Sequence, residues 1–406
     1  MILDILLRFR IHKVAIAGDI EKAFLNIEIP PEQGDFLRFL WVNDVSSENP
    51  ELIKLRFTRL VFGLTSSPFV LNATLRKHIM TEGKNDPLFV YNTLRSLYVD
   101  DYQSSFSTNN EAFETYRKLK DSLHKVGFNM RKWVTNNKEL KERIKKHEAL
   151  YTPVSENANV LEDPNHEQPD TKVLGIGWNL ITDSLKLDFE KIVRDTSITM
   201  VTKRSILCTT AKFYDPLGLI SPVILPLKCL FQELCKIKEN WDSPVHDKIA
   251  QKFRDIILDI RSVSKIELPR SVMHEVEVSD IKSVQLHGFS DASTVAYAAS
   301  VYLRVETSSR VVSHLIASKT RVSPLKSESV PRLELMGALI LARLMKTVSD
   351  ALSATLNIDQ TFCWSDSQIV IWWIFGENKT FKQYVQNRIK VVLDPEDDFS
   401  YVFENH

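Results

Sequence analysis

The chain contains two sets of three carboxylates, and the members of each set are widely spaced along the sequence. The first set is Asp19, Asp100 and Asp101, and the second set is Asp291, Glu334 and Asp366. Carboxylates that converge in space repel one another unless a hard cation such as Mg²⁺ lies between them. Two such ions about 4 Å apart can activate an attacking oxygen and stabilise a leaving one, which is the physics of nucleotidyl transfer. Each set is therefore a candidate metal site.

The first set lies where two predicted strands end. Asp19 follows the apolar run at 14–17, and the pair Asp100-Asp101 follows Leu-Tyr-Val near the tip of a hairpin predicted over 94–106. Carboxylates at the ends of adjacent strands can converge on one point. Taken alone, an Asp-Asp pair is more often a solvated turn, so the pair by itself leaves both interpretations open.

The second set combines two strand ends and one helix. Asp291 lies in GFSDAS after a predicted strand, and Asp366 lies in CWSDSQ after another. Glu334 lies in PRLELMGAL, at the start of an apolar helix predicted over 333–348. Each acid alone is a weak signal, because acids at such places are common.

The elements that must position these acids indicate an α+β, multidomain fold. In the first part of the chain, strands are predicted at 36–42, 52–62 and 128–134, with a helix that opens at Ser67-Pro68 and another over about 110–126. In the second part, we predict a hairpin made of VLGIGW and LKLDF, and a mostly helical region over 190–262 that is broken at Asp215-Pro216 and Ser221-Pro222. Three strands over 281–317 and one at 361–364 complete the pattern.

Composition excludes several classes of protein. The 406 residues are 44% hydrophobic and 26% charged, which is typical of globular domains rather than disordered chains. Lys plus Arg and Asp plus Glu both total 52, which excludes a uniformly basic histone-like binder. The four cysteines form no C-x-x-C pair, and no apolar run reaches the roughly 20 residues of a membrane span. We expect an intracellular protein that is not secreted and has no membrane partner.

Five segments, in order, resemble the polymerase motifs of a reverse transcriptase, in the form found in BEL/Pao long-terminal-repeat retrotransposons. They are GDIEKAF (18–24), FGLTSSPF (62–69), LYVDDY (97–102), GFNMRKW (127–133) and VLGIGW (173–178). The resemblance implies a fragment of a retrotransposon Pol polyprotein, an RNA-directed DNA polymerase with ribonuclease H. Its partners would be an RNA template, a DNA primer, deoxynucleotides and an RNA-DNA hybrid, in a cytoplasmic virus-like particle, with nuclear entry as an alternative.

The resemblance also implies roles for individual residues in the polymerase site. Asp19 and Asp100 would bind two Mg²⁺ ions, with Asp101 beside them and the backbone carbonyl of Ile20 as a further ligand. The other implied contacts are with the nucleotide, the template or the primer. They would be made by Phe24, Phe62, Gly63, Lys132, Leu174 and Gly175.

Two of these roles have simple structural alternatives. Phe24 corresponds to the ring under the sugar of the incoming nucleotide, where it would exclude a ribose 2′-hydroxyl, but it is equally well explained as a core residue. Lys132 corresponds to a lysine near the triphosphate, and a solvated lysine at a strand edge explains it at least as well. Gly63 and Leu174-Gly175 are expected where backbone approaches the nucleotide or the primer.

The second set of acids resembles a ribonuclease H site with two Mg²⁺ ions. That family has a fourth carboxylate on the element after the last strand, which is predicted here at 399–403. Asp394, Asp397 and Asp398 precede this strand, so the ribonuclease H site is predicted to be incomplete at the C-terminus. The strands that form the polymerase fingers are likewise expected to be truncated before Asp19. A decayed or domesticated copy that binds nucleic acid without chemistry is the alternative function.

The resemblance divides the chain into four parts. They are a reverse transcriptase palm at 1–150, an acidic linker or insertion at 151–171, a primer-grip hairpin with thumb and connection at 172–270, and an incomplete ribonuclease H-like domain at 281–406. The middle of such chains carries the name Pao retrotransposon peptidase. An aspartic peptidase needs an Asp-Thr-Gly or Asp-Ser-Gly turn, and Asp195-Thr196-Ser197 lacks the glycine. Proteolysis is therefore disfavoured.

Overall fold

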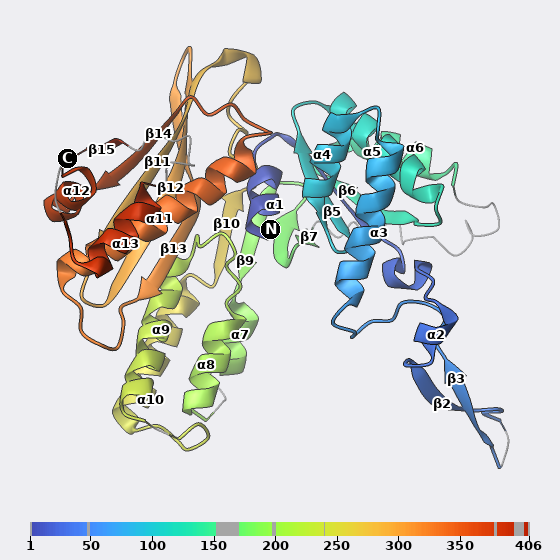
Figure 1. Cartoon of the computed structure of the whole chain (residues 1–406), viewed down its shortest axis with the longest axis horizontal. Coiled ribbons are helices and arrows are strands. Elements are labelled where there is room, and N and C mark those ends of the chain that lie inside the picture. Colours follow the sequence, from blue (N-terminus) through green and yellow to red (C-terminus); the bar gives the residue numbers. More distant parts are fainter. Residues whose placement is uncertain are drawn as a thin grey trace. The chain divides into compact units, whose positions relative to one another are not determined.

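The computed structural model describes residues 2–46, 49–151, 170–196, 200–238, 240–376 and 380–393, and the backbone of 402–404. It divides into two compact units (Figure 1). Residues 14–164 form one, here called the inserted unit. Residues 1–13 and 165–406 form the other, the composite unit. The acidic segment predicted at 151–171 falls almost entirely outside the described residues.

The inserted unit is built on a four-stranded sheet with the order β4-β5-β1-β6. The strands are β1 (Val14–Ile20), β4 (Leu97–Tyr98), β5 (Asp101–Phe106) and β6 (Met130–Thr135). The helices are η1 (Ala23–Asn26), α2 (Pro31–Gly34), α3 (Ser67–Glu82), α4 (Pro87–Ser96), α5 (Asn109–His124) and α6 (Lys138–Glu148). Helix α5 begins where the Thr108 side chain accepts a hydrogen bond from the Glu111 amide, and it buries the stripe that includes Tyr116 and Leu123.

Two predictions for this unit can be compared with the structure. The hairpin predicted over 94–106 is confirmed over 97–106 only, because residues 94–96 belong to α4. Val99 and Asp100 form its turn, and Asp101 begins β5 opposite Tyr98. The second strand predicted over 52–62 is too long, because β3 (Leu52–Arg56) ends after pairing with β2 (Arg38–Val42). The chain then turns to a different partner: the Ile29 and Leu60 amides donate to the carbonyls of Thr58 and Ile27, at 3.2 and 2.9 Å.

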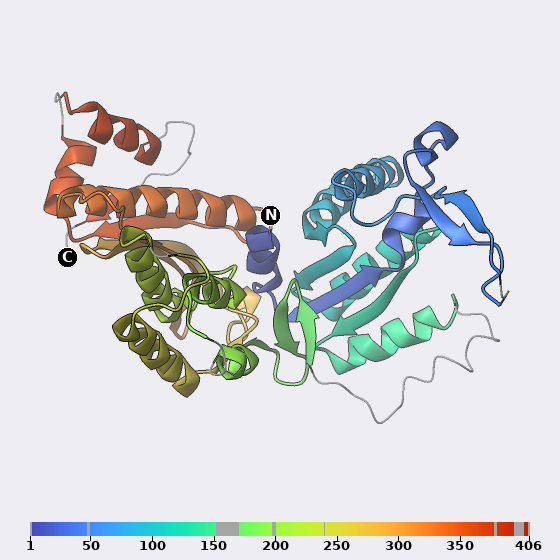
Figure 2. The ribbon, with the colours of Figure 1, turned by 90° about the horizontal axis from the view of Figure 1, so that it is seen from below.

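The composite unit contains a five-stranded sheet with the order β13-β12-β11-β14-β15. Its strands are β11 (Ile281–Ala292), β12 (Ala296–Thr307), β13 (Val311–Val322), β14 (Gln360–Ser365) and β15 (Val402–Glu404), and α11 (Val330–Leu352) lies along one face (Figure 2). Two shorter helices, α12 (Gln368–Phe375) and α13 (Gln383–Val392), follow β14. A Cβ on Gly288 would lie 2.5 Å from the end of the Leu341 side chain, so α11 packs closely on β11 at this glycine. The three strands predicted over 281–317 are confirmed.

A second sheet of the composite unit has the order β10-β9-β8-β7. Its strands are β7 (Asp170–Val173), β8 (Ile176–Asn179), β9 (Ser184–Asp188) and β10 (Lys265–Pro269). VLGIGW is therefore not one strand as predicted: Leu174 and Gly175, with φ of +46° and +86°, form the two-residue turn between β7 and β8. Two positive φ values match the type I′ turn, which follows the natural twist of a hairpin.

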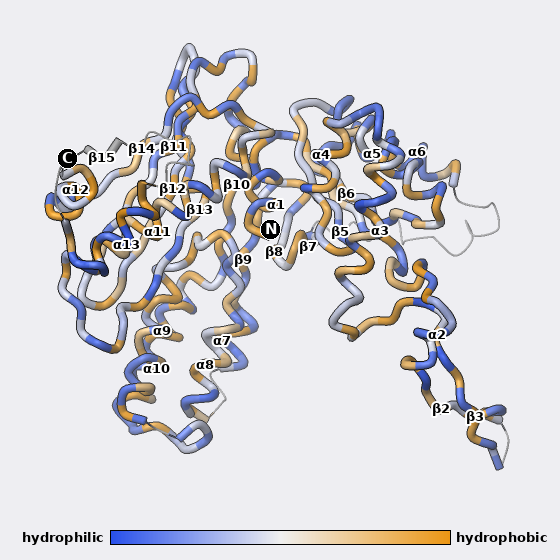
Figure 3. Tube along the Cα trace, in the orientation of Figure 1, coloured by the Kyte–Doolittle hydropathy of each residue, from blue (hydrophilic) through white to orange (hydrophobic). Residues whose placement is uncertain are grey.

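Four helices lie in the sequence between β9 and β10 of this sheet: α7 (Glu190–Thr196), α8 (Lys203–Lys212), α9 (Ser221–Lys236) and α10 (Asp247–Ser262). Hydrophobic and hydrophilic residues alternate along them (Figure 3), and the buried positions of α10, such as Phe253 and Ile257, have helical spacing. Ser221-Pro222 was predicted to break a helix and instead begins α9, because proline fits the first turn. Of the described helices, none has both the length and the apolarity to cross a membrane.

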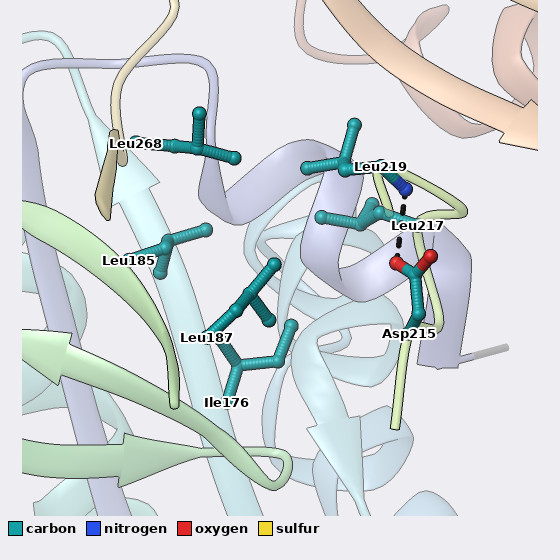
Figure 4. A pocket seen from close by; sticks show the side chains of 7 residues that line it. All are labelled: Ile176, Leu185, Leu187, Asp215, Leu217, Leu219 and Leu268. Carbon is teal, nitrogen blue, oxygen red and sulfur yellow. Dashed lines mark hydrogen bonds between the residues drawn. The ribbon is translucent and has the colours of Figure 1, made fainter. Parts of the chain in front are cut away.

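The loop at 214–219 joins α8 and α9 and contacts both sheets of the composite unit. Leu217 and Leu219 face side chains of β8, β9 and β10 across an apolar cavity of about 10 Å³ (Figure 4). The Asp215 carboxylate accepts hydrogen bonds from the Leu219 and Ile220 amides, both at 2.9 Å. On the other side of the loop, the Ser318 amide of β13 donates to the Leu217 carbonyl at 2.8 Å.

Helix α1 (Ile2–Phe9) is held in the composite unit by a buried arginine. Arg270 is fully buried and donates to the carbonyls of Phe9, His12 and Lys13, at 2.6 to 2.9 Å. Its charge is balanced by Asp183, whose two oxygens each lie 2.7 Å from a guanidinium nitrogen. A charge-assisted, bidentate pair of this kind holds its partners in a defined geometry.

Candidate metal centres

The structure brings Asp291, Glu334 and Asp366 together. One oxygen of each carboxylate lies within 4.8 Å of the others. The parallel pairing of β11 and β14 explains this, because Ser290 is opposite Ser365 and the next residue of each strand is an acid. Glu334 is added from the first turns of α11. Oxygen atoms at this spacing fit a hard divalent cation.

The electrostatics of this cluster also favour a cation. Burial, together with the charges of Asp291 and Asp366, raises the pKa of Glu334 to about 7. Glu334 is only 8% exposed, and its Oε2 has no hydrogen-bond partner among the described residues. An ionised carboxylate without a partner is costly to bury, and a bound cation would remove that cost.

Small residues let α11 come this close to the strand end. A Cβ on Gly337 would lie 3.3 Å from the Asp291 carbonyl oxygen, which leaves little room for a larger residue. Gly337 is one helical turn after Glu334, so the same close approach that requires glycine also delivers the Glu334 carboxylate to the strand end.

The acids of the first set also meet, at the end of β1 in the inserted unit. Asp19 is directly opposite Asp101 in the antiparallel pairing of β1 and β5. Side chains directly opposite in such a pair point to the same face of the sheet. Asp100 occupies the turn before β5, and its carbonyl accepts a hydrogen bond from the Ile20 amide at 2.9 Å. In the described part of the chain, these acids do not form a set of three as tight as the Asp291 cluster.

The pKa values show that the carboxylates of the first set repel one another. Burial, together with the charges of Asp100 and Asp19, raises the pKa of Asp101 to about 6. Burial and the charge of Asp19 raise the pKa of Asp100 as well. The turn that carries Asp100 is strained, because Val99 has a φ of +57°, which β-branched residues rarely adopt. A cation would relieve the repulsion here as it would at Glu334.

Lys132 is the cation that the fold places nearest to Asp19. Its Nζ lies 3.4 Å from the Asp19 carboxylate, and its side chain is 78% exposed. The register of β1 and β6 shifts between Ala17 and Asp19, and Lys132 has a φ of +53° within this bulge. A bulge re-aims side chains, and here it brings Lys132 to the acids. An exposed lysine pair contributes little to stability.

A polar network behind the first set, built around the buried Lys120, was missed by the sequence interpretation. Glu21 accepts hydrogen bonds from Arg131 at 2.7 Å and from the Asn129 amide group at 3.1 Å. Burial raises the pKa of Glu21, but these bonds outweigh it and the pKa is lowered. The amide oxygen of Asn129 accepts in turn from Lys120 at 3.0 Å, and Lys120 pairs with Glu148 at 2.8 Å. A lysine within the apolar stripe of the helix predicted over 110–126 was the available signal.

Phe24 and Phe62 contact each other in the inserted unit. Phe24 is 7% exposed and belongs to the hydrophobic core, whereas Phe62 is 66% exposed. Their ring centroids lie 4.9 Å apart in an edge-to-face arrangement. Gly63 has a φ of +88°, with no heavy atom within 4 Å of the position of a Cβ, so its backbone is open on that side. The nucleotide contacts implied for these residues stay predictions.

Leu174 and Gly175 belong to the composite unit, whereas the acids of the first set belong to the inserted unit. A Cβ on Gly175 would lie 2.9 Å from the ring of Tyr214, so this glycine is also needed for packing. The primer contact implied for Leu174 and Gly175 stays a prediction. Asp394, Asp397 and Asp398 lie outside the described residues.

Comparisons with known proteins agree with this architecture. Residues 202–367 match the family model described as the Pao retrotransposon-like RNaseH-like domain. The match covers helices α8–α10, strands β11–β14 and all three acids of the second set. No curated protein sequence matches the chain.

The fold is similar to solved structures of the foamy viral protease-reverse transcriptase. The complex with RNA/DNA hybrid has a TM-score of 0.55 and 14% identity, over 99% of this chain and 45% of that one. A form called dRH, in complex with dsDNA, has a TM-score of 0.56 and 15% identity, over 100% of this chain and 59% of that one. A further complex with dsDNA has a TM-score of 0.52 and 16% identity, over 99% and 70%. The chain thus spans about half the length of the first two.

Proposed function

Since residues 202–367 match the model of the Pao retrotransposon-like RNaseH-like domain, we propose that the chain is a Pao-type retrotransposon Pol protein that acts on nucleic acid at both acid sets. The site at Asp291, Glu334 and Asp366 hydrolyses the RNA strand of an RNA-DNA hybrid. The single observation that carries this proposal is the convergence of these carboxylates to within 4.8 Å.

The residues of this site have separate tasks. Asp291 and Asp366 are exposed and can reach both solvent and a phosphodiester, whereas Glu334 holds its oxygen in the buried wall of the site. Together they would hold divalent cations, two Mg²⁺ ions in the proposed form. When bound, such ions lower the pKa of water and stabilise the charge that develops on phosphate oxygens. The raised pKa of Glu334 means that the site gains its full negative charge only near neutral pH.

A specific observation favours a second activity, RNA-directed DNA synthesis in the inserted unit. Asp19 and Asp101 are opposite each other on adjacent strands, and the turn at Asp100 is fixed by the Ile20 amide. These acids would hold the metal ions for attack of a primer 3′-hydroxyl on a deoxynucleotide, while the exposed ammonium group of Lys132 would contact phosphate oxygens. The partners are an RNA template, a DNA primer and deoxynucleotides. The foamy viral structures, in complex with RNA/DNA hybrid and dsDNA, support this class of partner.

The two activities can be tested in one protein with two variants. The purified chain would receive a primed RNA template with deoxynucleotides and, separately, a labelled RNA-DNA hybrid, both with Mg²⁺. We expect Asp100→Asn to reduce primer extension by more than about a hundredfold and to leave hydrolysis of the hybrid intact. Glu334→Gln should have the opposite effect. Each variant is the control for the other.

The alternative is a remnant that binds nucleic acid without chemistry. Template binding without extension or hydrolysis, in both Mg²⁺ and Mn²⁺, would support this alternative and contradict the proposed activities. Activity that persists in both variants would show that a different site, or a contaminating enzyme, is responsible.

A further inference from the structure

A cleft in the composite unit lies apart from both acid sets. Helices α9 and α11, strand β13 and the loop that precedes α9 form most of its walls, with Leu3 of α1 and Tyr297 of β12. Its volume is about 320 Å³. Cavities that bind small molecules begin at about this size. All of its lining residues belong to the composite unit.

Four cationic side chains line this cleft: Lys228, Lys319, Arg321 and Arg343. Within the described part of the chain, none of them forms a salt bridge. The single carboxylate in the lining is Asp215, and its oxygens already accept hydrogen bonds from the Leu219 and Ile220 amides. Like charges that line one cleft raise the local concentration of anions.

The rest of the lining is apolar or uncharged. Helix α11 contributes Leu339, Ile340 and Leu344, which form an apolar wall, and β13 contributes the hydroxyl-bearing residues Ser318 and Thr320. An inorganic anion would use only the cationic part of this cleft. A ligand with both a charged group and an apolar or planar body would use all of it.

We propose that this cleft binds a phosphate group attached to an apolar or planar body of about nucleotide size. The phosphate contacts the lysines and arginines, and the body packs against α11. A free nucleotide and one nucleotide of a single strand offer the same chemistry, and the experiment separates them. The cleft contains no cluster of acids, so binding here does not need a divalent metal, unlike binding at either acid set.

The test measures equilibrium binding to the full chain in EDTA, which removes metal-dependent binding at the acid sets. The probes are dAMP, inorganic phosphate and a short oligodeoxyadenylate. Lys228→Glu on α9 and Arg343→Glu on α11 reverse charges in the cleft. Lys236→Glu is the matched control, because it makes the same change at an exposed lysine of α9 outside the cleft. Thermal unfolding of each variant shows whether it is folded.

We expect dAMP to bind more tightly than inorganic phosphate. Each cleft variant should weaken the binding of dAMP by about tenfold, while Lys236→Glu should leave its affinity unchanged. Binding of the oligonucleotide alone, with the same pattern among variants, would also support the site and assign the phosphate to a strand. The proposal is overturned if no probe binds, if Lys236→Glu weakens binding as much as the cleft variants, or if phosphate binds as tightly as dAMP. Loss of catalysis in Asp100→Asn or Glu334→Gln leaves this outcome unaffected.

Discussion

Two buried charged residues, Glu334 and Lys120, differ in the partners that the fold gives them. Lys120 is 1% exposed, and its ammonium group has three hydrogen-bond acceptors, including the Glu148 carboxylate. Glu334 has an oxygen with no partner and two further acids beside it. A satisfied buried charge specifies structure, whereas a repelled one implies that a ligand completes the site.

The pH dependence of stability should report the charge of Glu334. Its pKa is raised from the ordinary 4.5 to about 7, so the folded protein holds the proton more tightly than the unfolded chain. The contribution of protonated Glu334 to the free energy of unfolding is therefore fully present below about pH 4.5. It is lost as the pH rises through 7. In EDTA, the ionisation of Glu334 should lower the free energy of unfolding over this range by about 3 kcal/mol at most, and Glu334→Gln should remove this part of the fall. The part due to Asp101, whose pKa is raised to about 6, stays in the variant.

Chemical unfolding from pH 4 to pH 8 measures this effect, with Glu306→Gln on β12 as a control that keeps the fall. Adding Mg²⁺ at pH 8 should raise the stability of the unmodified protein far more than that of Glu334→Gln. Identical pH profiles for the unmodified protein and Glu334→Gln would contradict the interpretation.

Replacing Lys120 should destabilise the inserted unit. Lys120→Met removes the partner of Glu148 and Asn129. Breaking a fully buried pair costs about 3–5 kcal/mol, and the 28% exposure of Glu148 puts the expected loss near the lower end. Lys118→Met is the matched control on the same helix, because Lys118 is 49% exposed and its pair with Asp86 is a surface pair. Urea unfolding should show a loss below about 1 kcal/mol for this control. Equal losses would mean that the network carries no special stability.

At the scale of the elements, the loop at 214–219 requires a glycine at position 218. Gly218 has a φ of +76°, and a Cβ there would lie 1.9 Å from the Ser318 carbonyl of β13. Gly63 also has a positive φ, but no atom lies within 4 Å of its Cβ position. Alanine at Gly63 would therefore cost only the strain of the backbone angle, whereas alanine at Gly218 would add a steric clash with β13.

Gly218→Ala should detach this loop from the edge of the sheet. We expect hydrogen exchange of the Ser318 amide, which donates to Leu217, to accelerate strongly, together with a loss of stability of several kcal/mol. Gly63→Ala should cost only about 1 kcal/mol, which is the strain of the left-handed conformation. Unchanged exchange at Ser318 would show that the loop can move aside without leaving β13.

The sequence predicted best those elements whose pattern is local. Strands β11 to β13 and helix α5 each bury one regular face and end at recognisable turns. The region of three strands at 281–317 and the helix at about 110–126 were therefore predicted, although β13 continues to Val322. The turn at Leu174-Gly175 was hidden within an apolar run, because nothing nearby shows that Tyr214 packs on the glycine. Asn129 forms hydrogen bonds with both Glu21 and Lys120. These residues are far apart in the sequence, and a hydrophobic pattern along the chain cannot predict contacts between them.

At the scale of the whole molecule, the division into two units predicts whether the two fragments of a proteolysed chain stay associated. Residues 1–13 belong to the composite unit, although residues 14–164 form a separate one. A protease site introduced within 152–164 should therefore give two fragments that stay together on size-exclusion chromatography, because α1 remains bound to Arg270. Arg270→Met should release them, while Arg204→Met, at an exposed pair with Asp242, should not. Separation of the fragments without any variant would contradict this.

The same arrangement determines the order in which a ribosome can complete the protein. The inserted unit is continuous in the sequence, so it can fold as soon as it has been translated. Helix α1 leaves the ribosome before the inserted unit but must wait for Arg270, which follows Phe9 by 261 residues. At about 5–20 residues per second, that wait lasts on the order of 10–50 seconds. During this time the apolar face of α1, with Leu6 and Phe9 uncovered, needs a chaperone or the nascent chain itself to protect it.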